Sequence, residues 1–192
     1  MSPGRVLFLL SLVALAGQRL AELRLSKTHE TAIRRAGGRE HGAAQYRIMQ
    51  ALHTGWFVAM AIEVLWRPRP FKQWLAAVAL PIFLIGQSLR YAAMRALGPR
   101  WTTRVMTIPG LSPVTGGIYR YLRHPNYVGV ILELAAFPLI YSAYWTALLF
   151  SFLNLLLLRA RIRLEERALA NDNHYLHFLG DRPRFLPRRI GE

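Results

Sequence analysis

The densest cluster of polar side chains in the sequence lies at residues 117–129, "GIYRYLRHPNYVG", directly before an almost entirely apolar run. A residue before proline avoids the α region, and proline suits the first turn of a helix. The pair His124–Pro125 therefore predicts that a helix begins at Pro125. Free N–H groups at a helix start favour anions, and Arg120 and Arg123 add positive charge beside it. The cluster predicts a binding site for a carboxylate or another anion at the edge of a membrane.

A carboxylate inside the apolar run is a second candidate, because ionisable groups within membrane spans are costly and usually functional. Glu133 shares a helix face with Asn126 and Val130, at the spacing i, i+4 and i+7. A carboxylate at that depth must be paired, neutral or directed into a cavity. Contact with a substrate and a purely structural pairing both stay open at this point.

A third candidate is a stripe in the last apolar segment, formed by Asn154, Leu158, Arg161 and Glu165 on one helix face. Arg161 and Glu165 can pair at i, i+4, and Glu166 adds a second carboxylate. The alternative is an Arg–Glu pair whose charged ends reach the membrane surface without further function.

One other polar cluster is expected to be structural. Gln18, Arg19 and Glu22 cluster at the inner end of the first apolar segment, where they predict a network between helices. No second histidine stands at a ligand-like spacing from His124, so we expect no metal site. The absence of cysteine excludes disulfides, thiolate catalysis and cysteine-ligated metals.

The elements that would position these residues are apolar helices. Hydrophobic residues make up 53% of the 192 residues. Four apolar regions are visible, at about 6–23, 48–66, 74–94 and 127–160. About 20 residues cross a bilayer as a helix, so the fourth region is too long for one span and predicts a tight helical hairpin. The sequence predicts an all-α integral membrane protein with five transmembrane helices.

The positive charge is sorted along the chain. Of the 25 Lys and Arg residues, 20 fall in 24–47, 90–124 and the tail from 159 onward, and three fall at Arg67, Arg69 and Lys72. The positive-inside rule then predicts an outside N-terminus, an inside C-terminus and a site on the cytoplasmic side of a bacterial-type inner membrane. Anionic membrane lipids explain the net charge of +15. No nucleic-acid-reading motif is apparent, so nucleic acid is not an expected partner.

Two alternatives compete with this layout. A cleaved secretory signal at residues 1–17 would leave a strongly basic segment outside, against the charge rule. A soluble helical bundle is disfavoured because residues 144–158 offer almost no polar face.

Two motifs carry a family resemblance. "TGGIYRYLRHPNYVG" at 115–129, followed by "RIRLEERAL" at 161–169, resembles the isoprenylcysteine carboxyl methyltransferase family. Its pattern is an RHPxYxG core and a later Glu-Glu pair preceded by Arg. The resemblance is strong over 97–169 and rests mainly on span layout before that. It implies an integral membrane enzyme that uses S-adenosylmethionine, with a methyltransferase core at 97–192 after a three-helix region at 1–96.

The resemblance also implies roles for single residues. It places Arg161 near the reacting group of the substrate, and we expect Asn126 and Asn154 to contact the substrate. The tail "NDNHYLHFLGDRPRFLP" departs from the Gly-acidic-x-Tyr run that is common in the family, which leaves His174, Tyr175 and His177 without an expected role. The residues implied to hold the cofactor are Tyr119, Arg123, His124, Pro125, Tyr127, Gly129, Glu165 and Glu166.

The sequence also bears on which molecule accepts the methyl group. The run from Thr103 to Leu148 also resembles the bacterial branch that O-methylates alkylresorcinols and alkylpyrones. A phenol has a pKa of about 10 and benefits from a base, and Glu133 is the expected base. O-methylation of a long-chain phenolic or pyrone lipid is therefore the leading expectation. The alternatives are carboxyl methylation of a prenylated cysteine-like substrate, phospholipid N-methylation, NADPH-dependent reduction as in sterol reductases, and lipid binding without catalysis.

Overall fold

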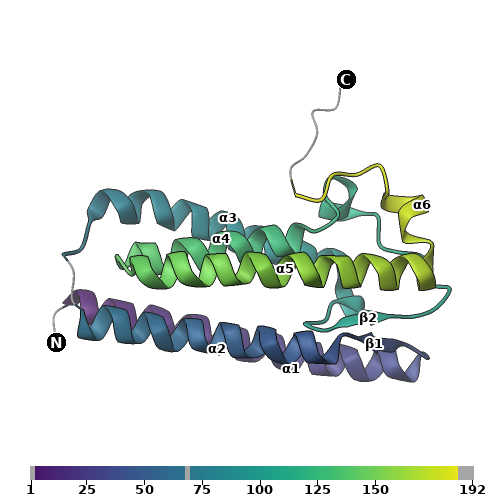
Figure 1. Ribbon diagram of the computed structural model, residues 1–192, viewed down its shortest axis with the longest axis horizontal. Helices are drawn as coiled ribbons and strands as arrows, with labels where there is room; N and C mark the ends of the chain where they lie inside the picture. The colour runs from purple at the N-terminus through teal and green to yellow at the C-terminus, as the bar shows by residue number, and fades with distance from the viewer. Residues whose placement is uncertain (1–2, 68–69, 186–192) are drawn as a thin grey trace.

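The computed structural model describes residues 3–67 and 70–185, which form a bundle of long helices with small elements gathered at one end (Figure 1). The long helices are α1 (Pro3–Arg35), α2 (Ala43–Trp66), α3 (Gln73–Leu97), α4 (Pro125–Ile140) and α5 (Tyr144–Asn173). The small elements are β1 (Arg39–His41), η1 (Gly98–Arg100), β2 (Val105–Thr107), η2 (Gly117–Arg120) and α6 (Tyr175–Leu179).

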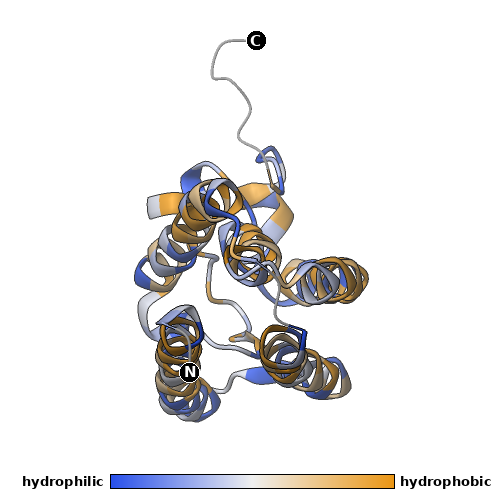
Figure 2. Cartoon of the chain, turned by 90° about the vertical axis from the view of Figure 1, so that its left-hand side faces the viewer, coloured by the Kyte–Doolittle hydropathy of each residue, from blue (hydrophilic) through white to orange (hydrophobic). Residues whose placement is uncertain are grey.

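Within the described residues, α1, α2 and α3 are each long and apolar enough to cross a membrane, whereas α4 has 16 residues. The lateral surface is rich in exposed apolar side chains, and Figure 2 shows long stretches of the helices in hydrophobic colour. Leu7, Val13 and Leu148 are each at least 60% exposed. A soluble protein rarely leaves so much apolar surface in water, so this surface belongs in lipid. The five helices follow the expected order, and five complete spans stay a prediction.

The first helix is longer than expected. The sequence predicted a loop over 24–47, but α1 continues to Arg35 because residues 24–35 contain no glycine or proline. Gly37 follows the end of the helix, and its φ of 80° suits a glycine at that position. The expectation of an all-α fold also needs correction, since β1 and β2 form a two-stranded antiparallel sheet with Arg39 opposite Thr107.

The expected hairpin is present. The helix α4 begins at Pro125, as the His-Pro pair predicted, and a turn of three residues leads into α5. Glu63 of α2 covers the start of α5. Its carboxylate accepts hydrogen bonds from the backbone N–H groups of Trp145 (3.1 Å) and Thr146 (2.7 Å). These N–H groups have no partner within their own helix, so Glu63 satisfies them from a neighbouring one.

The helices α3 and α4 approach each other closely at two glycines. A Cβ atom added to Gly129 would lie 2.6 Å from the carbonyl oxygen of Gly86 and 2.5 Å from Cγ of Arg90. Only residues without a side chain permit this distance, as is common where membrane helices cross. Gly129 therefore has a packing role that its motif alone did not reveal.

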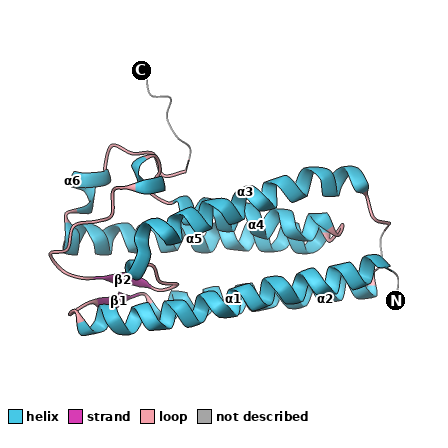
Figure 3. Ribbon diagram, turned by 180° about the vertical axis from the view of Figure 1, so that it is seen from behind, coloured by secondary structure: helices cyan, strands magenta, loops and turns pink. Residues whose placement is uncertain are grey.

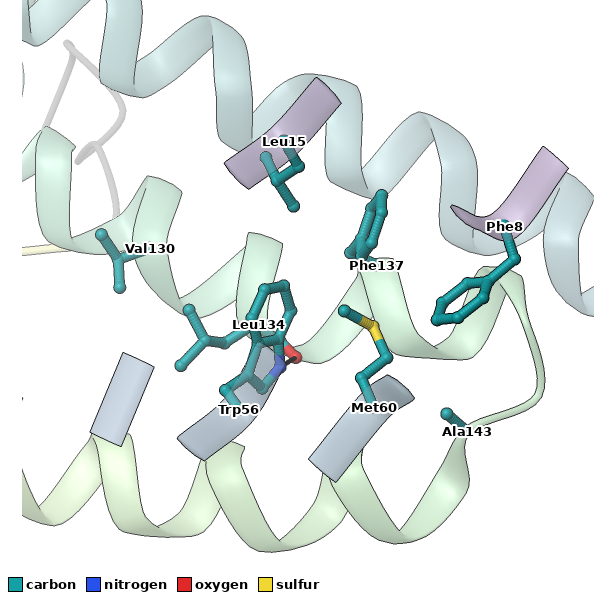
Figure 4. Packing of buried hydrophobic residues seen from close by; sticks show 8 residues of the cluster. All are labelled: Phe8, Leu15, Trp56, Met60, Val130, Leu134, Phe137 and Ala143. Carbon is teal, nitrogen blue, oxygen red and sulfur yellow. Dashed lines mark hydrogen bonds between the residues drawn. The ribbon is translucent and has the colours of Figure 1, made fainter. Parts of the chain in front are cut away.

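The apolar core packs between α1, α2 and α4 (Figure 4). The indole N–H of Trp56 donates to the carbonyl oxygen of Leu134 at 3.2 Å, which satisfies the one polar atom that Trp56 brings into the core. The buried members are Phe8, Leu15, Trp56, Met60, Val130, Leu134, Phe137 and Ala143.

The basic segments of the sequence share one end of the molecule. The strands, η2 and α6 lie at this end, and the start of α1 and the α4–α5 turn lie at the other (Figures 1 and 3). This arrangement agrees with the charge sorting along the chain, while the side of the membrane that each end faces stays a prediction. Arg69, one of the three basic residues expected outside, lies beyond the described residues.

Candidate functional site

Two cavities meet at the end that carries the strands. The smaller has a volume of about 140 Å³ and lies among β2, η2, α5 and α6. The larger has a volume of about 440 Å³ and extends between α1 and α2 on one side and α4 and α5 on the other. They share part of their lining, so ligands in the two cavities would meet there. The shared residues are Leu97, Thr102, Arg104, Tyr119, Arg123 and Glu165.

The smaller cavity combines charged, hydroxyl and apolar groups. Arg100, Arg123 and Glu165 provide charge of both signs, beside apolar side chains such as Leu111. Tyr175 is 3% exposed, and its hydroxyl has no hydrogen-bond partner among the described residues. Burial raises the pKa of Tyr175, so the hydroxyl stays protonated and available as a donor.

Glu166 fastens the C-terminal tail to the cluster that opened the sequence analysis. Its carboxylate lies 3.0 Å from Nε2 of His124 and accepts two hydrogen bonds from Arg184, at 2.9 and 2.5 Å. Burial by itself would raise the pKa of Glu166, but the hydrogen bonds and charges of His124 and Arg184 outweigh it and lower the pKa to about 2. Glu166 lines neither cavity.

The tail makes further contacts with the same loop. The backbone N–H groups of Arg123 and His124 donate to the carbonyl oxygens of Pro183 (3.0 Å) and Arg184 (3.2 Å). Arg182 donates to the carbonyl oxygen of Tyr119 at 2.5 Å. Residues 182–184 therefore cover the start of α4 and hold the loop that forms the shared lining.

Tyr127 connects the two charged residues of the α5 stripe. Its hydroxyl donates to Glu165 and accepts from Nε of Arg161 at 3.0 Å, and Arg161 also donates to the carbonyl oxygen of Thr103 at 2.7 Å. The sequence predicted a direct Arg161–Glu165 pair, and the structure instead inserts a tyrosine hydroxyl between them. Arg161 is 5% exposed and lines the larger cavity.

Asn154 presents an unsatisfied amide to the larger cavity. It is 1% exposed, and neither its Oδ1 nor its Nδ2 has a partner among the described residues. Asn126 lines the same cavity, and its Oδ1 is also buried without a partner. Leaving such groups without a hydrogen bond inside a membrane protein is costly, so we expect a polar group of a ligand to hydrogen-bond to them.

Glu133 belongs to the network that the sequence predicted around Arg19. It is 2% exposed, accepts a hydrogen bond from Arg19, and lies 3.4 Å from Nε of Arg90. Glu22 pairs with the same two arginines and is hydrogen-bonded by Gln18. Arg19 and Arg90 line the larger cavity, whereas Glu133 does not. Its role as a general base stays a prediction, and its contacts are those of a residue that positions two arginines.

The structure thus gathers most of the predicted residues, in different roles. Tyr119, Arg123 and Glu165 line both cavities. Pro125, Gly129 and Glu166 line neither and serve the helix start, the helix crossing and the tail. Those that line the larger cavity alone are His124, Asn126, Tyr127, Asn154 and Arg161.

The sequence analysis missed other lining residues. Tyr175 lies in the tail that departs from the family pattern, and His53 of α2 lines the larger cavity without any charged residue nearby in sequence. No local spacing marks either residue, because their neighbours in the fold are distant in the chain.

Comparison with known proteins decides the family. The sequence model of the isoprenylcysteine carboxyl methyltransferase (ICMT) family matches residues 77–171. An uncharacterized protein of Bacillus subtilis (strain 168), YpbQ, is 36% identical over 163 residues, which cover 85% of this chain and 96% of the relative. The chain belongs to the ICMT family. An uncharacterized protein of Haemophilus influenzae is 27% identical over 154 residues, covering 80% of this chain and 89% of that protein.

A solved structure supports the fold. The eukaryotic intramembrane Ras methyltransferase ICMT matches with a TM-score of 0.52 and 24% identity, over 67% of this chain and 46% of that one. The chain therefore spans less than half the length of that enzyme. Members of the ICMT family are membrane methyltransferases that use S-adenosylmethionine, and this chain is accordingly an integral membrane methyltransferase.

The smaller cavity fits the chemistry of that cofactor. S-adenosylmethionine carries a carboxylate, an ammonium and a sulfonium, together with a flat adenine. Arg100 and Arg123 match the carboxylate, Glu165 matches the positive groups, and the unpartnered hydroxyl of Tyr175 can donate to a polar atom. Apolar side chains that could contact the adenine include Ile108, Leu111, Val114 and Leu169.

Proposed function

We propose that the protein transfers the methyl group of S-adenosylmethionine to a hydroxyl oxygen of a long-chain phenolic or pyrone lipid. The observation that carries the proposal is the pair of cavities with a common lining at Tyr119, Arg123 and Glu165. The smaller cavity has the more polar lining of the two and lies at the basic end, and the larger extends between apolar helices. Methyl transfer needs water excluded and the two reactants aligned, and adjoining cavities favour the alignment.

On the cofactor side, we assign Tyr119, Arg123, Glu165 and Tyr175 to binding. When bound, S-adenosylmethionine supplies an electrophilic methyl group on sulfur. His124 and Glu166 act indirectly in this proposal, because they hold the tail and the loop that carries Arg123.

On the acceptor side, the larger cavity receives the lipid. Leu20 of α1 and Val58 of α2 line it and are each more than half exposed on the apolar surface. This combination suits an alkyl chain that enters from the membrane between α1 and α2. The unpartnered amide of Asn154 then contacts the polar head of the lipid, close to Arg161 on the same helix face.

A neutral head group is favoured by the way the cavity arginines are paired. Arg19 and Arg90 pair with carboxylates, as do Arg104 and Arg123. Arg161 has no carboxylate within ion-pair distance in the described part of the chain, and it carries the second candidate: a carboxylate acceptor, as in carboxyl methylation of a prenylated cysteine-like substrate. We nevertheless favour a hydroxyl acceptor over a carboxylate acceptor, because the charges of the other arginines are compensated and the amides of Asn126 and Asn154 are neutral.

We also propose that all five long helices span the membrane, with the N-terminus outside and the strand-bearing end in the cytoplasm. The proposal is supported by the charge sorting and by the gathering of the basic segments at one end. In a bacterial-type inner membrane this arrangement exposes the smaller cavity to a cytoplasmic supply of cofactor.

Purified full-length protein incubated with methyl-labelled S-adenosylmethionine tests the function. Parallel reactions contain an alkylresorcinol, an alkylpyrone, a prenylcysteine analogue and phosphatidylethanolamine, and label is counted in the lipid phase. We expect label in the resorcinol or pyrone product. Label in the prenylcysteine reaction alone would favour the second candidate, and label in phosphatidylethanolamine alone would contradict both.

A further inference from the structure

His53 lies on α2, on the opposite side of the larger cavity from α5, and lines it together with Asn154 and Arg161. Its Nδ1 lies 2.8 Å from the carbonyl oxygen of Met49, one helical turn earlier. A carbonyl oxygen can only accept a hydrogen bond, so Nδ1 must carry the proton. In the neutral ring the lone pair then belongs to Nε2, which has no hydrogen-bond partner among the described residues.

The other groups near this cavity are less suited to accept a proton. The carboxylate of Glu22 is held by Arg19 and Arg90. The carboxylate of Glu165 already accepts a hydrogen bond from the hydroxyl of Tyr127. Glu133, the base expected from the sequence, is paired with arginines and does not line the cavity. His53 is a lining residue that offers a fixed and unshared lone pair.

We infer that His53 is the general base that accepts the proton of the acceptor hydroxyl, an inference that rests on the proposed function. The acceptor oxygen attacks the methyl carbon, its proton passes to Nε2 of His53, and the electron pair of the broken C–S bond stays on sulfur. The products are a methyl ether, S-adenosylhomocysteine and an imidazolium, so the positive charge of the sulfonium reappears on the ring. The imidazolium loses its proton before the next turnover.

The test uses acceptor acidity, because a base matters only for an acceptor that still carries its proton. Two acceptors with the same alkyl chain are compared, a resorcinol and a nitro-substituted resorcinol that is ionised at the assay pH. His53→Gln should lower kcat for the resorcinol by about 10²-fold or more, the usual contribution of a positioned base. The same variant should change turnover of the ionised acceptor by less than about threefold. Equal loss on both acceptors, or no loss on the resorcinol, would overturn the inference.

Controls separate folding and function from the base role. His177→Gln changes an exposed histidine of α6 and should leave both rates unchanged. Titration calorimetry should give the same affinity of His53→Gln and wild type for S-adenosylmethionine. If His53→Gln fails to bind the cofactor, His53→Ala is assayed with and without added imidazole, and restored turnover of the resorcinol supports the inference, whereas no restoration overturns it. A wild-type enzyme that labels only the prenylcysteine analogue would overturn the proposed function itself, before any variant is measured.

Discussion

The apolar core and the lining of the two cavities treat buried polar atoms differently. In the core, the indole N–H of Trp56 donates to the carbonyl oxygen of Leu134. Along the cavities, Asn154 is fully buried with both amide atoms unpartnered in the described part of the chain, and Tyr175 has a buried hydroxyl that is unpartnered there. Buried polar groups are normally paired. The difference indicates that the core is built for stability and that the cavity lining is completed by ligands.

The largest effect should come from the apolar core. Met60 has no exposed surface and packs against Phe8 and Trp56 in the core cluster (Figure 4). Met60→Ala should lower the free energy of unfolding by about 2–5 kcal/mol, because it leaves a cavity among closely packed side chains. Unfolding in mixed detergent measures it. The affinity for S-adenosylmethionine of the folded variant should not change.

Ile62→Ala is the matched control, since Ile62 lies on the same helix and is 48% exposed on the apolar surface. Its unfolding free energy should stay close to that of the wild type. A loss of cofactor affinity in folded Met60→Ala would show that the apolar core and the cavities are not independent.

The next effect should come from Arg161 and should spare stability. Arg161→Gln keeps a donor near Tyr127 but removes the cavity charge that has no direct carboxylate partner. We expect turnover to fall by about 10²- to 10³-fold, the scale measured when one transition-state donor is lost. Labelled-methyl transfer measures it, with Arg163→Gln, an exposed position on the same helix, as the control. Near-normal turnover in Arg161→Gln would contradict the assignment of the larger cavity as the acceptor site.

Features that rest on a regular local pattern were easier to predict than contacts between distant parts of the chain. The start of α4 at Pro125 and the stripe Asn154–Arg161–Glu165 follow from rules on neighbouring residues, and both are present. The approach of Gly86 to Gly129 and the contact of Arg184 with Glu166 join residues that are separated in sequence. Such contacts follow from helix packing and leave no spacing signal in a single chain.

Glu133 shows how a correct principle can lead to an incomplete interpretation. Its sequence position indicated that a buried carboxylate must be paired or directed into a cavity, and the structure contains the pairing, with Arg19 and Arg90. The sequence could not choose between these options, because Arg19 and Arg90 come from two other helices. His53 was overlooked for the related reason that its cavity forms only when α2 and α5 are brought together.

Substitution of Asn154 should have a smaller effect, and it should raise the free energy of unfolding, whereas Met60→Ala lowers it. Asn154→Leu removes a buried amide without partners, so the free energy of unfolding in the absence of ligand should rise, by about 1–2 kcal/mol. Turnover of the proposed lipid should fall about tenfold through a higher KM, because the head group loses its amide contact. Thermal unfolding and steady-state kinetics measure the two quantities. A variant that is less stable and binds the lipid normally would mean that the amide serves the fold.

The smallest effect concerns the tail and pH. The pKa of Glu166 in the folded protein is about 2, below its usual value of about 4.5, because His124 and Arg184 hydrogen-bond its carboxylate. A carboxyl group whose pKa is lower in the folded protein stabilises the fold at any pH above its ordinary pKa. This stabilisation is lost as the pH falls from about 4.5 through 2. Hydrogen exchange of the backbone N–H groups of Arg123 and His124, which donate to the tail, should therefore be equally slow at pH 7 and pH 5, once corrected for intrinsic rates, and should quicken only below about pH 4.5. Arg184→Gln should exchange faster there at pH 7 and bind S-adenosylmethionine a fewfold more weakly, with Phe185→Leu as the control. Docking already lost between pH 7 and pH 5 would contradict this assignment.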